Sequence, residues 1–198
     1  MIKDRPPTTA DVATRIAAGD DRTSYDSLSI ALHWLTVVLV LAQFALSQVW
    51  GFTPRPTRHL LIVTHMSFGI LLAAVIAVRI LWRLSPGRQT PVSAAGWRIE
   101  LAAKAVHYLL YALLVSEAVL GFVLRWSGNE SMSFFGLEIA PPFAPLSKAA
   151  HHNIGEAHEF IGWAIIALAV AHAGAAIFHH LVVRDTVLVR MLPRLKRR

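Results

Sequence analysis

Four long apolar stretches constrain the fold of this chain more than any other feature of its sequence. Each reaches the roughly 20 residues that a helix needs to cross the hydrocarbon core of a bilayer. They run near Ile30–Trp50, Leu60–Trp82, Leu101–Leu124 and Phe160–Val183. Their interiors hold few charges, with Arg79 and Glu117 as the exceptions. Since helices of a soluble bundle are shorter and keep a polar face, the sequence predicts an all-α membrane protein, a four-helix transmembrane bundle.

The positive charge of the chain is partitioned between the two sides of this predicted bundle. Fifteen of the 19 lysine and arginine residues lie in the N-terminal tail, around the second loop or at the C-terminus. The other side holds only Arg55, Arg58, Arg125 and Lys148. By the positive-inside rule, both termini are expected in the cytoplasm. A charge divided in this way does not indicate nucleic-acid binding.

The predicted bundle forms one domain with a tail at each end. Residues 1–24 lack the apolar segment of a signal peptide and are expected to form a polar, disordered cytoplasmic tail. Residues 25–193 form the four-helix domain, and residues 194–198 form a basic cytoplasmic tail. The longest outer loop, Arg125–Glu156, is rich in proline, glycine and aromatic residues. We expect it to lie on the bilayer surface and to include a short helix.

Several of the ten histidines lie within the apolar stretches, where an ionisable side chain is costly and usually functional. His158 and His172 are fourteen residues apart. At 1.5 Å per residue they share a helix face and stand about 21 Å apart, a spacing that suits two haem irons across a membrane. The chain has no cysteine, which excludes thiolate ligation and covalent haem attachment. The pattern therefore favours b haems held by axial histidines.

Helix direction predicts which histidines lie at the same depth. His65 and His158 fall in the outer half of the bundle, whereas His33 and His172 fall in the inner half. The simplest arrangement pairs them in that way, with two haems stacked between helices. On depth alone, His107 could replace His33. Gly69 and Gly162 each follow a predicted ligand by four residues, a spacing that favours either close approach of a macrocycle or helix packing through small residues.

Short motifs along the chain extend this interpretation. They are SIALHW, THMSFGI, AHEFIGW, AHAGAAIFHH and RDTVLVRMLP. Together they resemble the bacterial cytochrome b561 family over Tyr25 to Pro193. The resemblance implies a four-helix inner-membrane protein with two b haems, and its ligand histidines correspond to His33, His65, His158 and His172. The closest functional likeness is to the superoxide oxidase branch, in which periplasmic superoxide is oxidised to oxygen and ubiquinone is reduced. Glu117 and the long N-terminal tail depart from the family pattern.

An electron carrier of this kind needs an entry and an exit. On the outer side, a positive cluster is expected to raise the local concentration of a small anion such as superoxide. Its residues are Arg55, Arg58, His59, Lys148, His151 and His152. Arg58 and Lys148 could equally bind lipid head groups or haem propionates. On the inner side, His179 and Arg79 are expected near the inner haem. His179 could donate a hydrogen bond and a proton to ubiquinone, and Arg79 could contact the quinone or neutralise a propionate.

Three functions remain open at this level. The first is a stand-alone oxidoreductase that moves electrons from superoxide to ubiquinone. The second is a haem b membrane-anchor subunit that serves a partner dehydrogenase or hydrogenase. The third is a transporter or structural bundle without haem. The small size of the chain, 198 residues, and its lack of a docking domain favour the first. Its expected partners are membrane lipid, superoxide and ubiquinone.

Overall fold

The structure, a computed structural model, describes residues 25–85 and 97–192, together with Thr8, Ala10 and Thr14. The remainder of the predicted N-terminal tail, part of the loop after the second helix, and the basic tail at 194–198 lie outside the described residues. Each predicted apolar stretch lies within one candidate span, and all four spans are long and apolar enough to cross a membrane. The first and fourth spans, Ser27–Phe52 and Lys148–Val183, each continue past their α-helix through a short 3-10 or π-helical turn. The helices are α2 Ser27–Val49, α3 Arg55–Leu84, α4 Trp97–Ser127 and α5 Lys148–Phe178.

Local signals define several helix ends. The Asp26 carboxylate caps α2 by accepting a hydrogen bond of 2.8 Å from the Ser29 backbone N–H. Ser147 caps α5 by accepting a hydrogen bond from the Ala150 N–H at 3.2 Å. At the start of α3, proline at the second position costs no hydrogen bond, because the first N–H groups of a helix have no partner within it. These caps fix the helix starts and therefore the depth of each side chain.

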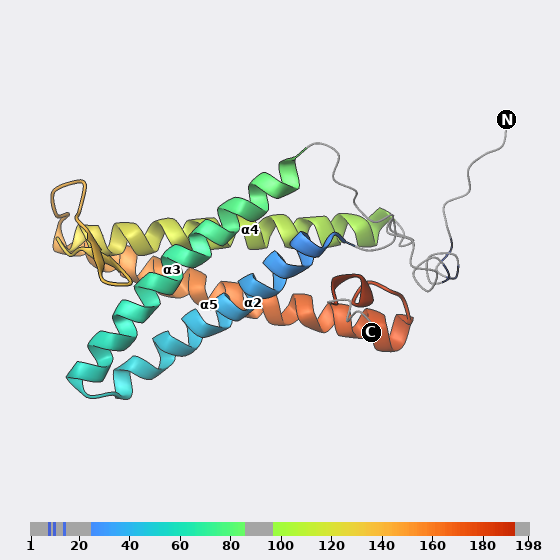
Figure 1. Cartoon of the computed structure of the whole chain (residues 1–198), viewed down its shortest axis with the longest axis horizontal. Coiled ribbons are helices and arrows are strands. Elements are labelled where there is room, and N and C mark those ends of the chain that lie inside the picture. Colours follow the sequence, from blue (N-terminus) through green and yellow to red (C-terminus); the bar gives the residue numbers. More distant parts are fainter. Residues whose placement is uncertain (1–7, 9, 11–13, 15–24, 86–96, 193–198) are drawn as a thin grey trace.

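The helices form two antiparallel pairs, α2 with α3 and α4 with α5, and α3 also packs on α4. The two termini of the bundle lie at one end in Figure 1, which we call the terminal end. The turn between α2 and α3 and the loop between α4 and α5 lie at the opposite end, which we call the hairpin end. A small apolar core of Ile76, Leu114 and Ile165 lies between the ends. Many large apolar side chains face outward, as lipid contact requires.

The loop between α4 and α5 contains a β-hairpin in place of the short helix that we expected. Strands β1 (Met132–Phe134) and β2 (Leu137–Ile139) are antiparallel, with Phe134 opposite Leu137. Phe135 and Gly136 form the turn with φ values of 49° and 92°. Positive φ at both positions is typical of two-residue hairpin turns, and glycine adopts it without strain. The FG pair between apolar residues was the sequence signal for this turn.

Ser67 attaches this hairpin to α3. Its side chain is buried, and its hydroxyl accepts a hydrogen bond of 3.0 Å from the Phe135 backbone N–H. The same hydroxyl lies 2.9 Å from the Val63 carbonyl oxygen and 3.3 Å from that of Ser133. The hairpin is therefore held against the helix that carries His65, two residues away.

Replacing Ser67 is expected to loosen the hairpin. Ser67→Ala removes the acceptor of the Phe135 N–H, and a hydrogen bond of this kind contributes about 0.5–1.5 kcal/mol. We expect a lower melting temperature and faster proteolysis within 132–139 in detergent. Thr64→Ala is the matched control, because the Thr64 hydroxyl bonds only to the Leu60 carbonyl in its own helix. Equal behaviour of the two variants would contradict an anchoring role for Ser67.

Candidate functional site

At the hairpin end, His65 on α3 faces His158 on α5. Their ring centroids are 6.4 Å apart, and their planes are inclined at 81°. Two imidazoles that bind one metal from opposite sides, each with a nitrogen about 2 Å from the metal, place their centroids about 6 Å apart. The observed separation therefore fits two imidazoles that would hold one metal ion between them.

These two histidines line a cavity of about 790 Å³ between the four helices. Four buried polar atoms on its wall have no hydrogen-bond partner among the described residues: Gln43 Oε1, His65 Nδ1, Glu117 Oε2 and His158 Nδ1. Buried polar groups in proteins are usually paired. Several unpaired polar atoms and two facing imidazoles around one cavity are typical of a binding site for a ligand that carries polar groups at its edge.

Glycines shape the wall of this cavity. Gly69 and Gly162, predicted to share a face with the ligands, both line it. A Cβ atom on Gly69 would lie 2.9 Å from Gln43 Nε2, and one on Gly162 would lie 3.2 Å from Glu117 Oε1. Larger residues would therefore displace side chains that face the cavity. Gly121 on α4 similarly lies close to the His158 ring, with 3.4 Å from its ideal Cβ position to Cε1.

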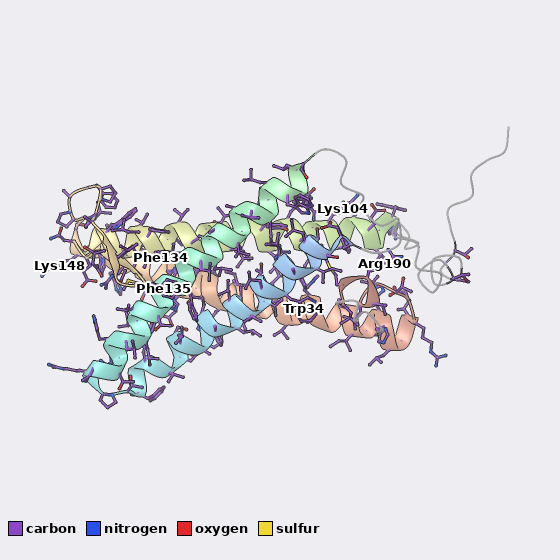
Figure 2. All side chains as sticks on the ribbon, in the orientation of Figure 1. Trp34, Lys104, Phe134, Phe135, Lys148 and Arg190 are labelled. Atoms are coloured by element: carbon purple, nitrogen blue, oxygen red, sulfur yellow. The ribbon has the colours of Figure 1, made fainter. Side chains whose placement is uncertain are left out.

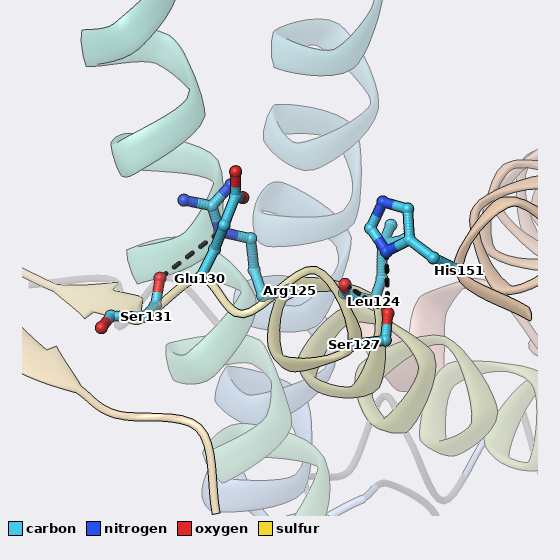
Figure 3. Close-up of polar contacts among 6 residues, drawn as sticks. All are labelled: Leu124, Arg125, Ser127, Glu130, Ser131 and His151. Atoms are coloured by element: carbon cyan, nitrogen blue, oxygen red, sulfur yellow. Dashed lines mark hydrogen bonds and ion pairs between the residues drawn. The ribbon is translucent and has the colours of Figure 1, made fainter. Parts of the chain in front are cut away.

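Polar contacts close the rim of the cavity beside the loop. The His151 Nδ1 and the buried Ser127 hydroxyl are 2.8 Å apart and share a hydrogen bond. Arg125 forms an ion pair with Glu130, and its Nε donates to the Ser131 carbonyl at 3.4 Å (Figure 3). Of the predicted outer cluster, only His151 lines the cavity.

Arg58 and Lys148 lie at the same end but on different elements. The Arg58 guanidinium donates to the carbonyl oxygens of Trp50, Gly51 and Thr53 at 3.2–3.4 Å, beyond the C-terminus of α2. Lys148 is the first residue of α5, beside the loop in Figure 2. In the described part of the chain, no hydrogen bond or ion pair joins Arg58 to Lys148. The predicted cluster thus consists of cations that lie on separate elements around the hairpin end of the bundle.

Three more histidines, His33, His107 and His172, lie close together toward the terminal end. His107 packs edge-on against His172, with ring centroids 5.0 Å apart, and His107 Nδ1 donates to the Ala103 carbonyl at 2.5 Å. His33 lies within electrostatic range of both histidines and of Arg79. Arg79 donates to the Thr36 hydroxyl at 2.9 Å and stacks over the Tyr111 ring, 5.3 Å from its centroid.

His179 has a carboxylate partner that the sequence reasoning missed. After α5, the chain makes one π-helical turn from His179 to Val183, and Arg184 then adopts a left-handed φ of 57°. This reversal brings Asp185 Oδ2 to 2.6 Å from His179 Nδ1. The other carboxylate oxygen accepts the Val187 backbone N–H at 3.0 Å. The RDT sequence six residues beyond the histidine was the available signal, but only the left-handed turn creates the contact.

Comparison with known proteins identifies the family to which this chain belongs. A family profile described as prokaryotic cytochrome b561 matches residues 24–194. The chain belongs to the prokaryotic cytochrome b561 family. Among its relatives is cytochrome b561 homolog 1 of Escherichia coli K12, 34% identical over 87% of this chain and 98% of the relative. Cytochrome b561 homolog 2 of the same organism is 31% identical over 85% and 90%. A Yersinia pestis protein named probable superoxide oxidase CybB is 29% identical over 86% and 96%.

Cytochrome b561 proteins are four-helix membrane proteins that transfer electrons through b haems, generally two. The hairpin-end cavity fits one such group, because it combines facing imidazoles, unpaired polar atoms and glycine-lined walls. The terminal-end cluster of His33, His107 and His172 offers the imidazoles for a second. The predicted fold and family are therefore confirmed.

Proposed function

We propose that this cytochrome b561 oxidises superoxide at its hairpin end and reduces ubiquinone at its terminal end, through two b haems. The observation that carries the proposal is the placement of one histidine cluster at each end of the bundle. A relative named probable superoxide oxidase supports the choice of donor. The balanced reaction takes one electron from each of two superoxide anions. It yields two molecules of oxygen and, with two protons, converts one ubiquinone to ubiquinol.

In this proposal, His65 and His158 hold one haem and His33 and His172 hold the other. The 6.4 Å centroid separation supports the first pair. For the second, the edge contact of His107 with His172 at 5.0 Å is shorter than the roughly 6 Å that a shared metal needs. This contact supports His107 as a neighbour of the second site, with His33 and His172 as the residues that would hold the haem. When bound, the haems supply one-electron redox chemistry.

The hairpin end faces the periplasm in this proposal, and both termini lie in the cytoplasm. The charge partition of the sequence supports this orientation in the bacterial inner membrane. Superoxide would then meet Arg58, Lys148 and His151 before it reaches the outer site. Histidines that hold the haem iron would leave superoxide to exchange its electron without binding the iron, and these cations would act by attracting the anion and positioning it.

Ubiquinone reduction is assigned to the terminal end, where lipid and cytoplasmic protons meet. His179 is half-buried and is oriented by the Asp185 carboxylate. When the Asp185 carboxylate accepts the Nδ1–H and the ring is protonated, the Nε2–H can donate to a quinone carbonyl oxygen and pass it a proton. Arg79 lies closer to His33, where it can neutralise a propionate or hold the quinone.

The proposal is tested by stopped-flow mixing of the purified oxidised protein with superoxide. We expect rapid haem reduction, followed by reoxidation only when a ubiquinone analogue is present. Superoxide dismutase added before mixing is the control, and it should abolish haem reduction. If superoxide does not reduce the haems, or if reduced haem persists with the quinone, the proposal is wrong and a partner subunit becomes the better electron donor or acceptor.

The rate of reduction by superoxide should depend on ionic strength. Neutralising Arg58 and Lys148 together, as Arg58→Gln and Lys148→Gln, should slow haem reduction several-fold, since cationic surfaces raise anion on-rates by about 10–1000-fold. Added salt should slow the wild type toward the mutant rate, because exposed charges are screened. Lys104→Gln removes a cation from the terminal end and serves as the control. A wild-type rate that does not change with salt would contradict electrostatic steering.

A further inference from the structure

Glu117 is a carboxyl group in the middle of a membrane-spanning helix. No other acidic residue occurs in α4 between Glu100 and the end of the helix at Ser127. An ionisable side chain at this depth is costly and is generally retained for a function. Its side chain points inward, with 22% of its surface exposed, and it lines the hairpin-end cavity. The reaction proposed above does not use it.

The nearest polar partner of Glu117 is one of the proposed haem ligands. Glu117 Oε1 lies 3.3 Å from His158 Nδ1. The two atoms are not aligned as a hydrogen bond, and both Glu117 Oε2 and His158 Nδ1 are buried without another partner. Gly162, one turn after His158, provides the space for the carboxyl group, because a Cβ there would lie 3.2 Å from Oε1. At 3.3 Å the two atoms are already within hydrogen-bond distance, so a hydrogen bond between them requires a change of angle and not of separation.

We propose that Glu117 is a positioning residue for His158, whose Nδ1–H it accepts so that Nε2 is left to bind the haem iron. An outer partner of this kind fixes the tautomer and orientation of a ligating imidazole and makes it more electron-rich. A more electron-rich ligand stabilises ferric over ferrous iron and so lowers the midpoint potential of that haem. Among the described residues, His65 has no such side-chain partner at Nδ1, so the two proposed ligands of this haem differ. The proposal rests on the hairpin-end haem site and is independent of superoxide or quinone chemistry.

The test compares Glu117→Ala and Glu117→Gln with the matched control Glu156→Gln. Glu156 is a carboxyl group on the same helix as His158, but it does not line the cavity and its side chain is exposed. The measurements are redox titration of each haem, electron paramagnetic resonance of the ferric protein, and haem transfer to an apoprotein acceptor. The midpoint potential that is missing from the redox titration of His158→Ala is the potential of the hairpin-end haem.

In Glu117→Ala, the hairpin-end haem should have a more positive midpoint potential and about 10- to 100-fold weaker affinity, as is typical when an outer partner is removed. The terminal-end haem should be unchanged. Glu117→Gln keeps an acceptor oxygen, so it should shift the potential less and retain haem. Glu156→Gln should match the wild type at both haems.

Two results would overturn the proposal. One is that the hairpin-end haem of Glu117→Ala keeps the midpoint potential and the electron paramagnetic resonance spectrum of the wild type. The other is an equal shift of both haems, which would show a general effect on the bundle. If Glu117→Ala does not fold, the comparison of Glu117→Gln with Glu156→Gln decides. An unchanged resonance signature in Glu117→Gln would then reject the assignment.

Discussion

His65→Ala and His158→Ala are each expected to remove the same haem, and with it about half of the haem b bound by the protein. The reason is geometric: the two rings face each other across one cavity at 6.4 Å, so either substitution leaves a haem with one axial ligand. Pyridine haemochrome measurements per protein, together with the potential of the remaining haem, check the outcome. The double variant should lose no more haem than either single variant.

The terminal end gives the complementary result. His33→Ala and His172→Ala should each lose the terminal-end haem. A double variant that combines either substitution with His158→Ala should therefore bind almost no haem. His107→Ala is the control: it removes an imidazole that touches His172 at 5.0 Å but should keep both haems. Loss of a haem in His107→Ala with retention in His33→Ala would reverse the assignment of the second ligand.

His179→Ala is expected to slow haem reoxidation by a ubiquinone analogue by at least about 100-fold, the usual contribution of a positioned proton donor. Both haems and the fast reduction by superoxide should be retained, because His179 lies seven residues beyond His172, toward the end of the helix. Stopped-flow measurement of each half-reaction separates the two effects. His180→Ala, which removes the adjacent exposed imidazole, should resemble the wild type.

Asp185 should act through His179 alone. Asp185→Asn is expected to slow reoxidation less than His179→Ala, and to add nothing in the His179→Ala background, since residues that act as a unit are not additive. A further loss in the double variant would indicate a structural role for Asp185. Unchanged reoxidation in His179→Ala would instead move the quinone site, with Arg79 as the next candidate.

The sequence alone was sufficient to predict the four spans, the family and the relation between His65 and His158. The reason is that a bilayer imposes strong local rules. A span must be long and apolar, and its helix converts residue number directly into depth and face. Histidines at matching depths can therefore be predicted without knowledge of helix packing. The same holds for Gly69 and Gly162, which share a helix face with His65 and His158.

Contacts that depend on how helices rotate against each other were decided only by the tertiary structure. Depth could not distinguish His33 from His107, whereas packing set His107 edge-on to His172. Glu117 was visible as an unusual charge, but its position beside His158 depends on the α4–α5 interface. Asp185 reaches His179 only through a left-handed turn at Arg184. Helical periodicity fixes depth and face within one element, but the partner of each side chain is fixed by the packing between elements.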